Sequence, residues 1–173
     1  MQTNVKFAKV KPDAKIPSKR DEDMGFDIYA CFDEDYMMIP PHETKLIPTG
    51  IASSCDPEYG FVLRERGSTG SKGIALRAGI IDSGYRNEWF VGLTNTTNQK
   101  LFISKLSKEE LYKKIGYTLH NFDDFCNYYP YSKAIAQALV IPVPKVEVEE
   151  ISYEELQAIP SERGLGALGS SNK

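Results

Sequence analysis

Gly79-Ile80-Ile81-Asp82-Ser83-Gly84-Tyr85 is the stretch that best indicates how this chain folds. Two β-branched residues precede an acid, a small-residue turn and an aromatic ring. Trp89-Phe90-Val91-Gly92-Leu93 follows as a return strand, so we predict a β-hairpin. Asp82 can cap this turn by accepting hydrogen bonds from backbone amides. It can equally be an acid at the mouth of a cleft, with Tyr85 as a flat platform beside it.

Short strand signals recur along the chain at intervals of about ten residues, separated by Gly and Pro. This spacing favours an all-β fold, either a sandwich or a barrel, and a length of 173 residues suits one domain. The predicted strands, besides the first half of the hairpin, cover residues 5–10, 25–30, 36–39, 44–51, 60–64, 73–77, 89–94, 100–103, 135–141 and 145–151.

One segment departs from the β pattern. Ser107-Lys108-Glu109-Glu110 has the sequence of a capping box, with Ser at the N-cap and Glu three residues later. It predicts a short helix over residues 108–115 that ends at Gly116. Ion pairs Glu109–Lys113 and Glu110–Lys114, each at i,i+4 spacing, would support that helix.

The aromatic-rich residues 117–131 follow this helix. Their rings either cover a flank of the β core or offer an interaction surface. Covering is favoured, because exposed aromatic patches are uncommon on the surfaces of monomers.

Composition excludes several classes of protein. A net charge of −3 gives no polycationic surface, so we expect no direct binding of nucleic acid. No signal peptide and no apolar run of the roughly 20 residues that span a bilayer is visible, so we expect no membrane segment. Three cysteines without a C-x-x-C argue against a disulfide framework or a zinc site and for a cytoplasmic setting. Two histidines nearly exclude sites that need several.

Two further stretches could bind phosphate. Arg64-Glu65-Arg66-Gly67-Ser68-Thr69-Gly70-Ser71-Lys72-Gly73 combines amides, hydroxyls and cations, although it does not fit a Walker A loop and could be a plain polar turn. Residues 161–171 place one Arg among glycines and serines. Taken alone they read as a frayed tail, but the same composition suits a clamp that closes over phosphate.

Five separated segments together resemble the trimeric dUTPase family. Asp23-Met24-Gly25-Phe26-Asp27-Ile28-Tyr29-Ala30 is similar to the family's A-G-[YF]-D-L motif, and Gly79-Ile80-Ile81-Asp82-Ser83-Gly84-Tyr85-Arg86 to G-x-I-D-x-x-Y. Residues 66–72 are similar to the R-S-[SG] loop, residues 135–137 to the end of G-D-R-I-A-Q, and residues 163–171 to R-G-x-G-G-F-G-S-T. Their order and rough spacing agree over nearly the whole chain.

The chain departs from the family pattern at several positions. Gly67 replaces the usual Ser and Asn87 a usual Gly, while Lys133 and Ala134 replace the usual Asp-Arg. Leu168 replaces the Phe that would stack over uracil, so the lid would be aliphatic. Residues 104–131 form an insertion, which some phage-encoded dUTPases also carry at this place.

The resemblance implies hydrolysis of dUTP to dUMP and pyrophosphate with Mg²⁺. Asp82 would activate the attacking water, because a carboxylate is ionised at neutral pH. Asp27 would hold Mg²⁺ through water. Tyr85 would stack under the deoxyribose and leave no room for a 2′-hydroxyl. The resemblance also implies three groups of contacts with the nucleotide. Phosphate would be bound by Arg66, Gly67, Ser68, Thr69, Lys72, Gln137 and Arg163. The uracil edge would be recognised by Gly79, Ile80 and Phe90, and the site would be closed by Leu168, Gly169 and Ser170.

The resemblance also implies a dUTPase-like β-barrel or jelly-roll sandwich, assembled as a homotrimer that exchanges its C-terminal arm, residues 161–173. Two alternatives remain. A dCTP deaminase has the same fold but needs a Glu in the return strand, where this chain has Gly92. A regulatory protein would instead bind a protein partner through the insertion.

Overall fold

The computed structural model describes residues 3–162 and 164, and only the backbone of residues 119 and 120. Contacts within the chain divide it into two compact units, the first ending at Val143 and the second beginning at Pro144. The single-domain assignment and the boundaries of the insertion and the arm stay predictions.

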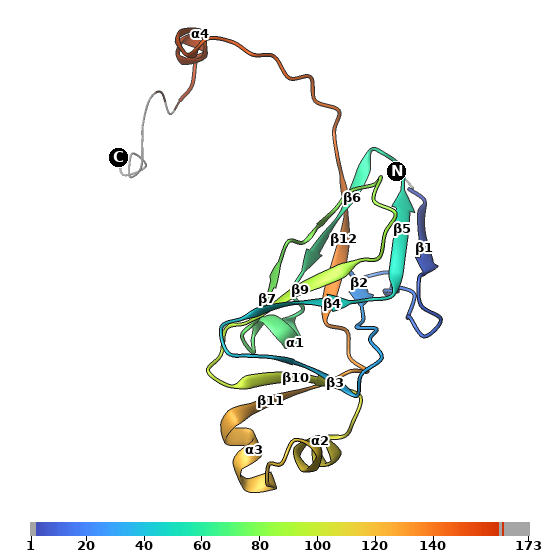
Figure 1. Cartoon of the computed structure of the whole chain (residues 1–173). Coiled ribbons are helices and arrows are strands. Elements are labelled where there is room, and N and C mark those ends of the chain that lie inside the picture. The colour runs from blue at the N-terminus through green and yellow to red at the C-terminus, as the bar shows by residue number, and fades with distance from the viewer. Residues whose placement is uncertain (1–2, 163, 165–173) are drawn as a thin grey trace. The chain divides into compact units, whose positions relative to one another are not determined.

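The first unit is built from short strands (Figure 1). They form small sheets with the orders β1-β5, β11-β10-β3, β2-β12-β6-β8 and β4-β9-β7. The predicted all-β fold is therefore confirmed, as a sandwich of sheets rather than a closed barrel. The strands are β1 (Val5–Lys9), β2 (Phe26–Ile28), β3 (Tyr36–Ile39), β4 (Thr44–Pro48), β5 (Ile51–Cys55), β6 (Tyr59–Arg64), β7 (Ile74–Arg77), β8 (Ile80–Ile81), β9 (Phe90–Asn95), β10 (Lys100–Ser104), β11 (Cys126–Pro130) and β12 (Ala136–Pro142).

The sheets enclose one main apolar core. In β9 and β10 every residue after the first is buried, and aromatic rings fill the centre of the core. Trp89 is fully buried, and its ring centroid lies 4.9 Å from that of Phe61 and 5.7 Å from that of Phe7. These rings connect β1, β6 and the start of β9, so the sheets pack as one body.

The predicted β-hairpin is only half correct. The turn forms, with the Tyr85 amide donating to the Asp82 carbonyl at 3.1 Å. However, β8 pairs with β6, while β9 lies between β4 and β7, so the two runs enter different sheets. The backbone of Trp89 exchanges hydrogen bonds with Thr49 and Ile51 instead of with β8. Alternation identifies a strand but does not name its partner.

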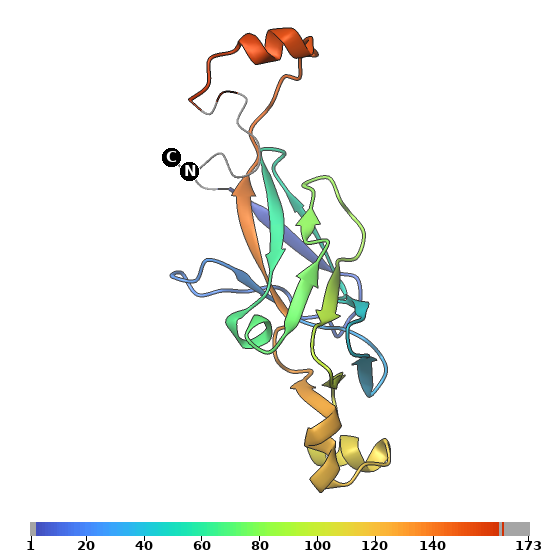
Figure 2. The same cartoon turned by 90° about the vertical axis from the view of Figure 1, so that its left-hand side faces the viewer.

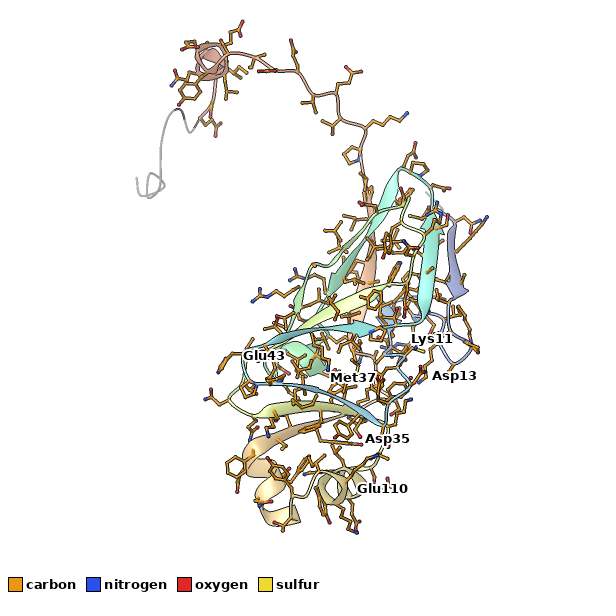
Figure 3. The ribbon with its side chains drawn as sticks, viewed as in Figure 1. Lys11, Asp13, Asp35, Met37, Glu43 and Glu110 are labelled. Atoms are coloured by element: carbon orange, nitrogen blue, oxygen red, sulfur yellow. The ribbon has the colours of Figure 1, made fainter. Side chains whose placement is uncertain are left out.

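Two helices, α2 (Lys108–Lys114) and α3 (Leu119–Phe125), lie at one end of the first unit beyond β10 and β11 (Figure 2). The capping box is confirmed, because Ser107 and Glu110 satisfy each other's backbone amides at 3.2 and 2.8 Å. The Glu109–Lys113 pair forms at 2.7 Å. The expected Glu110–Lys114 pair is wrong. Glu110 is committed to the cap, and Lys114 pairs with Asp35, which lies beside α2 in Figure 3.

The aromatic segment after α2 covers a second, smaller core. Phe102, Leu111, Phe122 and Cys126 are its buried members, whereas Phe125 is 57% exposed. Covering is thus confirmed for most of these rings. Helix α3 and strand β11 were not predicted from the sequence. The two helices form the crossover that lets β11 run parallel to β10, since parallel neighbours need a long connection.

The second unit contains α4 (Tyr153–Ala158), which the sequence analysis missed. It begins with a capping box in which the Glu155 amide donates to Ser152 at 3.1 Å and the Ser152 amide to Glu155 at 2.8 Å. The predicted strand over residues 145–151 is wrong, since these residues are in neither strand nor helix. Val146 and Val148 alternate with glutamates as in a strand, but a strand also needs a hydrogen-bonded neighbour.

The second core makes a direct prediction about stability. Phe122→Ala removes a fully buried ring and should lower the free energy of unfolding by about 3–5 kcal/mol. Phe125→Ala is the matched control, because that ring is 57% exposed and its loss should cost under about 1 kcal/mol. Guanidinium unfolding at one fixed protein concentration measures both. Equal losses would contradict the description of this core.

Candidate functional site

A broad open hollow of about 530 Å³ gathers residues from distant parts of the chain. Asp27 from β2, Arg66 from the loop after β6 and Gln137 from β12 all line it. Strand pairing explains why they meet. Gln137 lies opposite Asp27 on one neighbour of β12 and opposite Arg64 on the other. Three predicted site residues therefore come together in the folded chain.

Arg66 and Asp27 form a forked ion pair at the wall of this hollow. The Arg66 Nε lies 2.9 Å from Oδ1 of Asp27, and Nη2 donates to Oδ2 at 3.3 Å. Both side chains are about one-third exposed, at 31% and 32%. The two residues, expected from the sequence to have separate roles, are paired in the folded chain. A bound anion would compete with the carboxylate for Arg66.

The segment after Arg66 is a single helical turn, α1 (Gly67–Gly70), and not an open loop. Thr69 is buried, and its hydroxyl donates to the Arg66 carbonyl and accepts from the Arg66 amide, both at 3.0 Å. Thr69 thus shapes the turn. Ser68 and Lys72 are exposed and face solvent. A Cβ placed on Gly67 would have open space around it.

Gln137 is held in place by its neighbours. Its Nε2 donates to the Glu65 carbonyl at 2.8 Å. A Cβ on Gly25 would lie 2.9 Å from the Gln137 Oε1 and 3.1 Å from its Cβ, so glycine lets the first predicted motif approach this side chain without displacing it. The Glu65 carboxylate accepts a hydrogen bond from the Leu76 amide at 2.8 Å, which lowers the pKa of Glu65. The amide of Gln137 is therefore fixed beside Arg66.

Asp82 lies at a different place. It is exposed and lines a hollow of about 210 Å³ with Ile80, Tyr85 and Phe90. The Tyr85 hydroxyl donates to the Glu88 carbonyl at 3.1 Å. This hollow and the one that contains Arg66 share no lining residue. The predicted site residues thus lie in two separate hollows of one chain, which we name the Arg66 half-site and the Asp82 half-site.

Gly79 joins the Asp82 turn to the sheet. The Leu63 amide donates to the Gly79 carbonyl at 2.6 Å, and a Cβ on Gly79 would lie 2.6 Å from the Leu63 carbonyl oxygen. No side chain fits there, so the position requires glycine. This close approach holds Gly79, the first of the residues predicted to contact uracil, against β6.

The segment before Gly25 is a part of the site that sequence reasoning missed. Lys19, Arg20 and Asp23 line the Arg66 hollow, and the Ser18 carbonyl accepts from the Asp27 amide at 2.9 Å. The Arg20 side chain donates two hydrogen bonds of 2.8 Å to the Asp23 carboxylate. The only signal was the density of charges in residues 19–23, which is also typical of an ordinary surface loop.

Some predicted site residues cannot be placed. Arg163, Leu168, Gly169 and Ser170 lie outside the described residues. Within the described part of the chain, no group of three or more His, Cys, Asp or Glu side chains is arranged to hold a metal ion. The same residues contain no helix that is long and apolar enough to cross a membrane.

Comparison with known proteins gives consistent matches. The family model described as dUTPase matches residues 12–108. The chain is 33% identical to a deoxyuridine 5′-triphosphate nucleotidohydrolase of Nautilia profundicola, over 98% of this chain and 99% of that protein.

Two solved phage proteins share the fold. The dUTPase of Staphylococcus bacteriophage 80alpha, solved with dUpNHpp, is 22% identical with a TM-score of 0.71 and covers 98% of this chain and 99% of its own. A mutant dUTPase from phage phi11 of S. aureus, described with a structural Mg(II) ion, is 18% identical with a TM-score of 0.64 and covers 87% of this chain and 99% of its own.

The Arg20–Asp23 pair predicts a pH dependence at the rim of the hollow. The hydrogen bond from the Arg20 side chain, followed by that from its amide, lowers the pKa of Asp23 from 3.8 to about 2. Because the folded-state pKa is depressed, this stabilisation is complete above 3.8 and is lost as the pH falls toward about 2. In Arg20→Gln, carboxyl NMR titration should show the Asp23 midpoint move up toward 3.8. An unmoved midpoint would mean that Arg20 does not hold this carboxylate in solution.

Proposed function

The chain belongs to the dUTPase family and is a dUTP nucleotidohydrolase, and from this premise we propose which residues perform the hydrolysis. Asp82 accepts a proton from the attacking water, whose oxygen bonds to the α-phosphorus of dUTP. The bond from that phosphorus to the α,β-bridging oxygen breaks, and pyrophosphate leaves with the electron pair. The products are dUMP and pyrophosphate. The exposed position of Asp82 beside an open hollow supports this role.

The phosphates bind at the other half-site in this proposal. The observation that supports this proposal is that one hollow is lined by Asp27, Arg66 and Gln137. Arg66 gives up one of its two hydrogen bonds to Asp27 and donates to a phosphate oxygen instead. A planar guanidinium has enough N–H donors to bind both groups. Ser68, Lys72 and the Gly67 amide complete the contacts, while Thr69 keeps the turn in shape. From the arm, Arg163 contacts the γ-phosphate, and Leu168, Gly169 and Ser170 close the site.

Nucleoside specificity is proposed for the Asp82 half-site. Tyr85 stacks under the deoxyribose, and its hydroxyl is already bound to the Glu88 carbonyl, which orients the ring. Backbone groups of Gly79, Ile80 and Phe90 contact the uracil edge. A base that leaves polar groups of the site without hydrogen-bond partners is rejected strongly. Loss of a single methylene contact discriminates much less.

Mg²⁺ is the proposed cofactor. The donor set fits this ion, because Mg²⁺ binds through one or two carboxylates together with phosphates and waters and does not need a cage of protein ligands. Asp27 and Asp23 are the two carboxylates that line the hollow, and Asp27 would hold the ion through water. When bound, Mg²⁺ neutralises charge on the phosphates. A structural Mg(II) ion in the phage phi11 relative supports a place for magnesium in this family.

The division of the site supports a homotrimer. Asp82 must reach phosphates held near Arg66, yet the two hollows share no residue within one chain. We therefore propose that Asp82 of one copy completes the hollow of a second, and that a third contributes its arm. Large apolar side chains near the Asp82 turn support burial of this face, with Ile80 68% and Phe90 42% exposed.

Three further assignments complete the proposal. A cytoplasmic setting is supported by Cys31, Cys55 and Cys126, all of which are buried and free. A protein partner at the insertion is supported only by the exposed ring of Phe125. The dCTP deaminase alternative has less support. Gly92 offers no acid, and a Cβ there would lie 2.9 Å from the Arg77 carbonyl oxygen.

Asp82→Asn tests the proposed base. The substitution keeps the shape of the side chain but cannot accept the proton, so kcat should fall by about 10²- to 10⁴-fold. Release of pyrophosphate from dUTP with Mg²⁺ measures kcat, and binding of dUpNHpp is the control that should stay close to native. A kcat within tenfold of native, roughly, would remove Asp82 from proton transfer.

Subunit mixing tests the shared site. Asp82→Asn and Arg66→Ala chains should each be inactive alone, but unfolding and refolding them together in equal amounts should restore activity. A site needs an intact Asp82 from one chain and an intact Arg66 from another, so about a quarter of the sites would be complete. Light scattering of the native protein should give three times the 19.4 kDa of one chain. A mixture that stays inactive would mean that both residues act within one chain.

A further inference from the structure

The segment between β8 and β9 is bound at its far end to a distant corner of the chain. The partly buried side chain of Glu88 accepts a hydrogen bond from the Gly50 amide at 2.7 Å. The next residue adds two bonds. The Trp89 carbonyl accepts from the Thr49 hydroxyl at 2.7 Å, and the Trp89 amide donates to the Ile51 carbonyl at 2.8 Å. Two consecutive residues are therefore attached to the junction of β4 and β5.

The Gly50 corner has little freedom of its own. Gly50 is buried with a φ of +66°, and a Cβ there would lie 2.8 Å from the Cβ of Ala14 and 2.9 Å from the Sγ of Cys31. Its carbonyl accepts from the Val10 amide at 2.7 Å. A buried amide without an acceptor is unfavourable, so the carboxylate that accepts from Gly50 is held at this corner.

From Glu88 a series of hydrogen bonds leads back to the Asp82 half-site. The Glu88 carbonyl accepts from the Tyr85 hydroxyl at 3.1 Å, and the Tyr85 amide donates to the Asp82 carbonyl at 3.1 Å. Tyr85 lines the hollow and is 38% exposed, so core packing does not enclose its ring. The direction of that ring therefore depends on the position of the Glu88 carbonyl.

We propose that Glu88 is a positioning residue that sets the preference of the enzyme for deoxyribose over ribose. Its carboxylate, bound to Gly50, fixes the carbonyl that orients Tyr85, and Glu88 itself contacts no substrate. The inference rests on the stacking role proposed above for Tyr85. Loss of the carboxylate should let the ring move and make room for a 2′-hydroxyl, so dUTP should lose more of its advantage than the phosphate contacts alone would explain.

The test measures kcat/KM for dUTP and for UTP and compares their ratio among variants. Glu88→Ala should lower this ratio by about tenfold, since one hydrogen bond to a charged group is lost. Glu88→Gln keeps a side-chain oxygen that can accept from Gly50, so it should retain the ratio within about twofold. A native ratio in Glu88→Ala would overturn the proposal, and so would equal losses in both variants.

Glu65→Ala is the matched control for general loosening of the chain. The Glu65 carboxylate also accepts from a backbone amide, that of Leu76 at 2.8 Å, but it lies beside the Arg66 half-site. The phosphates of dUTP and UTP are the same, so any change in kcat/KM should be shared and the ratio should stay native. A ratio that falls as far in Glu65→Ala as in Glu88→Ala would overturn the specific role of Glu88.

Tyr85→Phe tests the link from the other side, because it removes the hydroxyl that binds the Glu88 carbonyl and leaves the Gly50 bond in place. It should also lower the ratio, and it remains informative if Glu88→Ala does not fold. A native ratio in Tyr85→Phe would overturn the link. If the two residues act as one unit, the double variant Tyr85→Phe/Glu88→Ala should lower the ratio no more than the larger single effect. Effects that multiply would contradict this.

Tyr85→Ala separates the two levels of the proposal. An unchanged ratio in Tyr85→Ala would overturn the sugar-stacking role of Tyr85 itself. A lowered ratio there, with a native ratio in Glu88→Ala, would overturn only the role of Glu88.

Discussion

The pairing of β12 with two neighbours at once is the constraint on which the site depends. Residue 137 lies opposite residue 27 on β2 and residue 64 on β6, so segments that are far apart in sequence meet along one strand. Ala136 and Ala138 are fully buried, and their small size lets the central strand lie close under the core. Without this ladder Asp27, Arg66 and Gln137 would belong to unconnected loops.

Partial exposure of the Arg66–Asp27 pair suits a binding site better than a structural one. Breaking a fully buried pair costs about 3–5 kcal/mol, because one charge is left without a partner away from water. At roughly one-third exposure, this pair lies between that case and the case of exposed pairs, which solvent screens and which are worth about 0–1 kcal/mol. In the proposed function, Arg66 would therefore transfer to a phosphate at a smaller cost than a fully buried pair would impose. The hydrogen bonds between Thr69 and the Arg66 backbone would keep the turn in place during that exchange.

Sequence reasoning identified local features and missed those set by tertiary contacts. Alternation located β3 and β6 closely, and the capping box located α2, because both signals depend on neighbouring residues. The partner of β8 and the strand expected over residues 145–151 were wrong, since hydrogen-bonded neighbours come from distant segments. Family motifs named Asp27 and Arg66 but not their ion pair.

The two half-sites differ in electrostatic character, and in the proposed function this difference favours their separation in one chain. Arg66 is neutralised by Asp27, so its hollow tolerates solvent until an anion arrives. Asp82 stands exposed on a turn with apolar Ile80 beside it, a surface that gains stability when covered. Bringing a second copy over Ile80 would bury apolar area and carry the Asp82 carboxylate toward the hollow that contains Arg66 in one step. Assembly and completion of the site would then be the same event, with the apolar contact supplying the free energy that orders the charges.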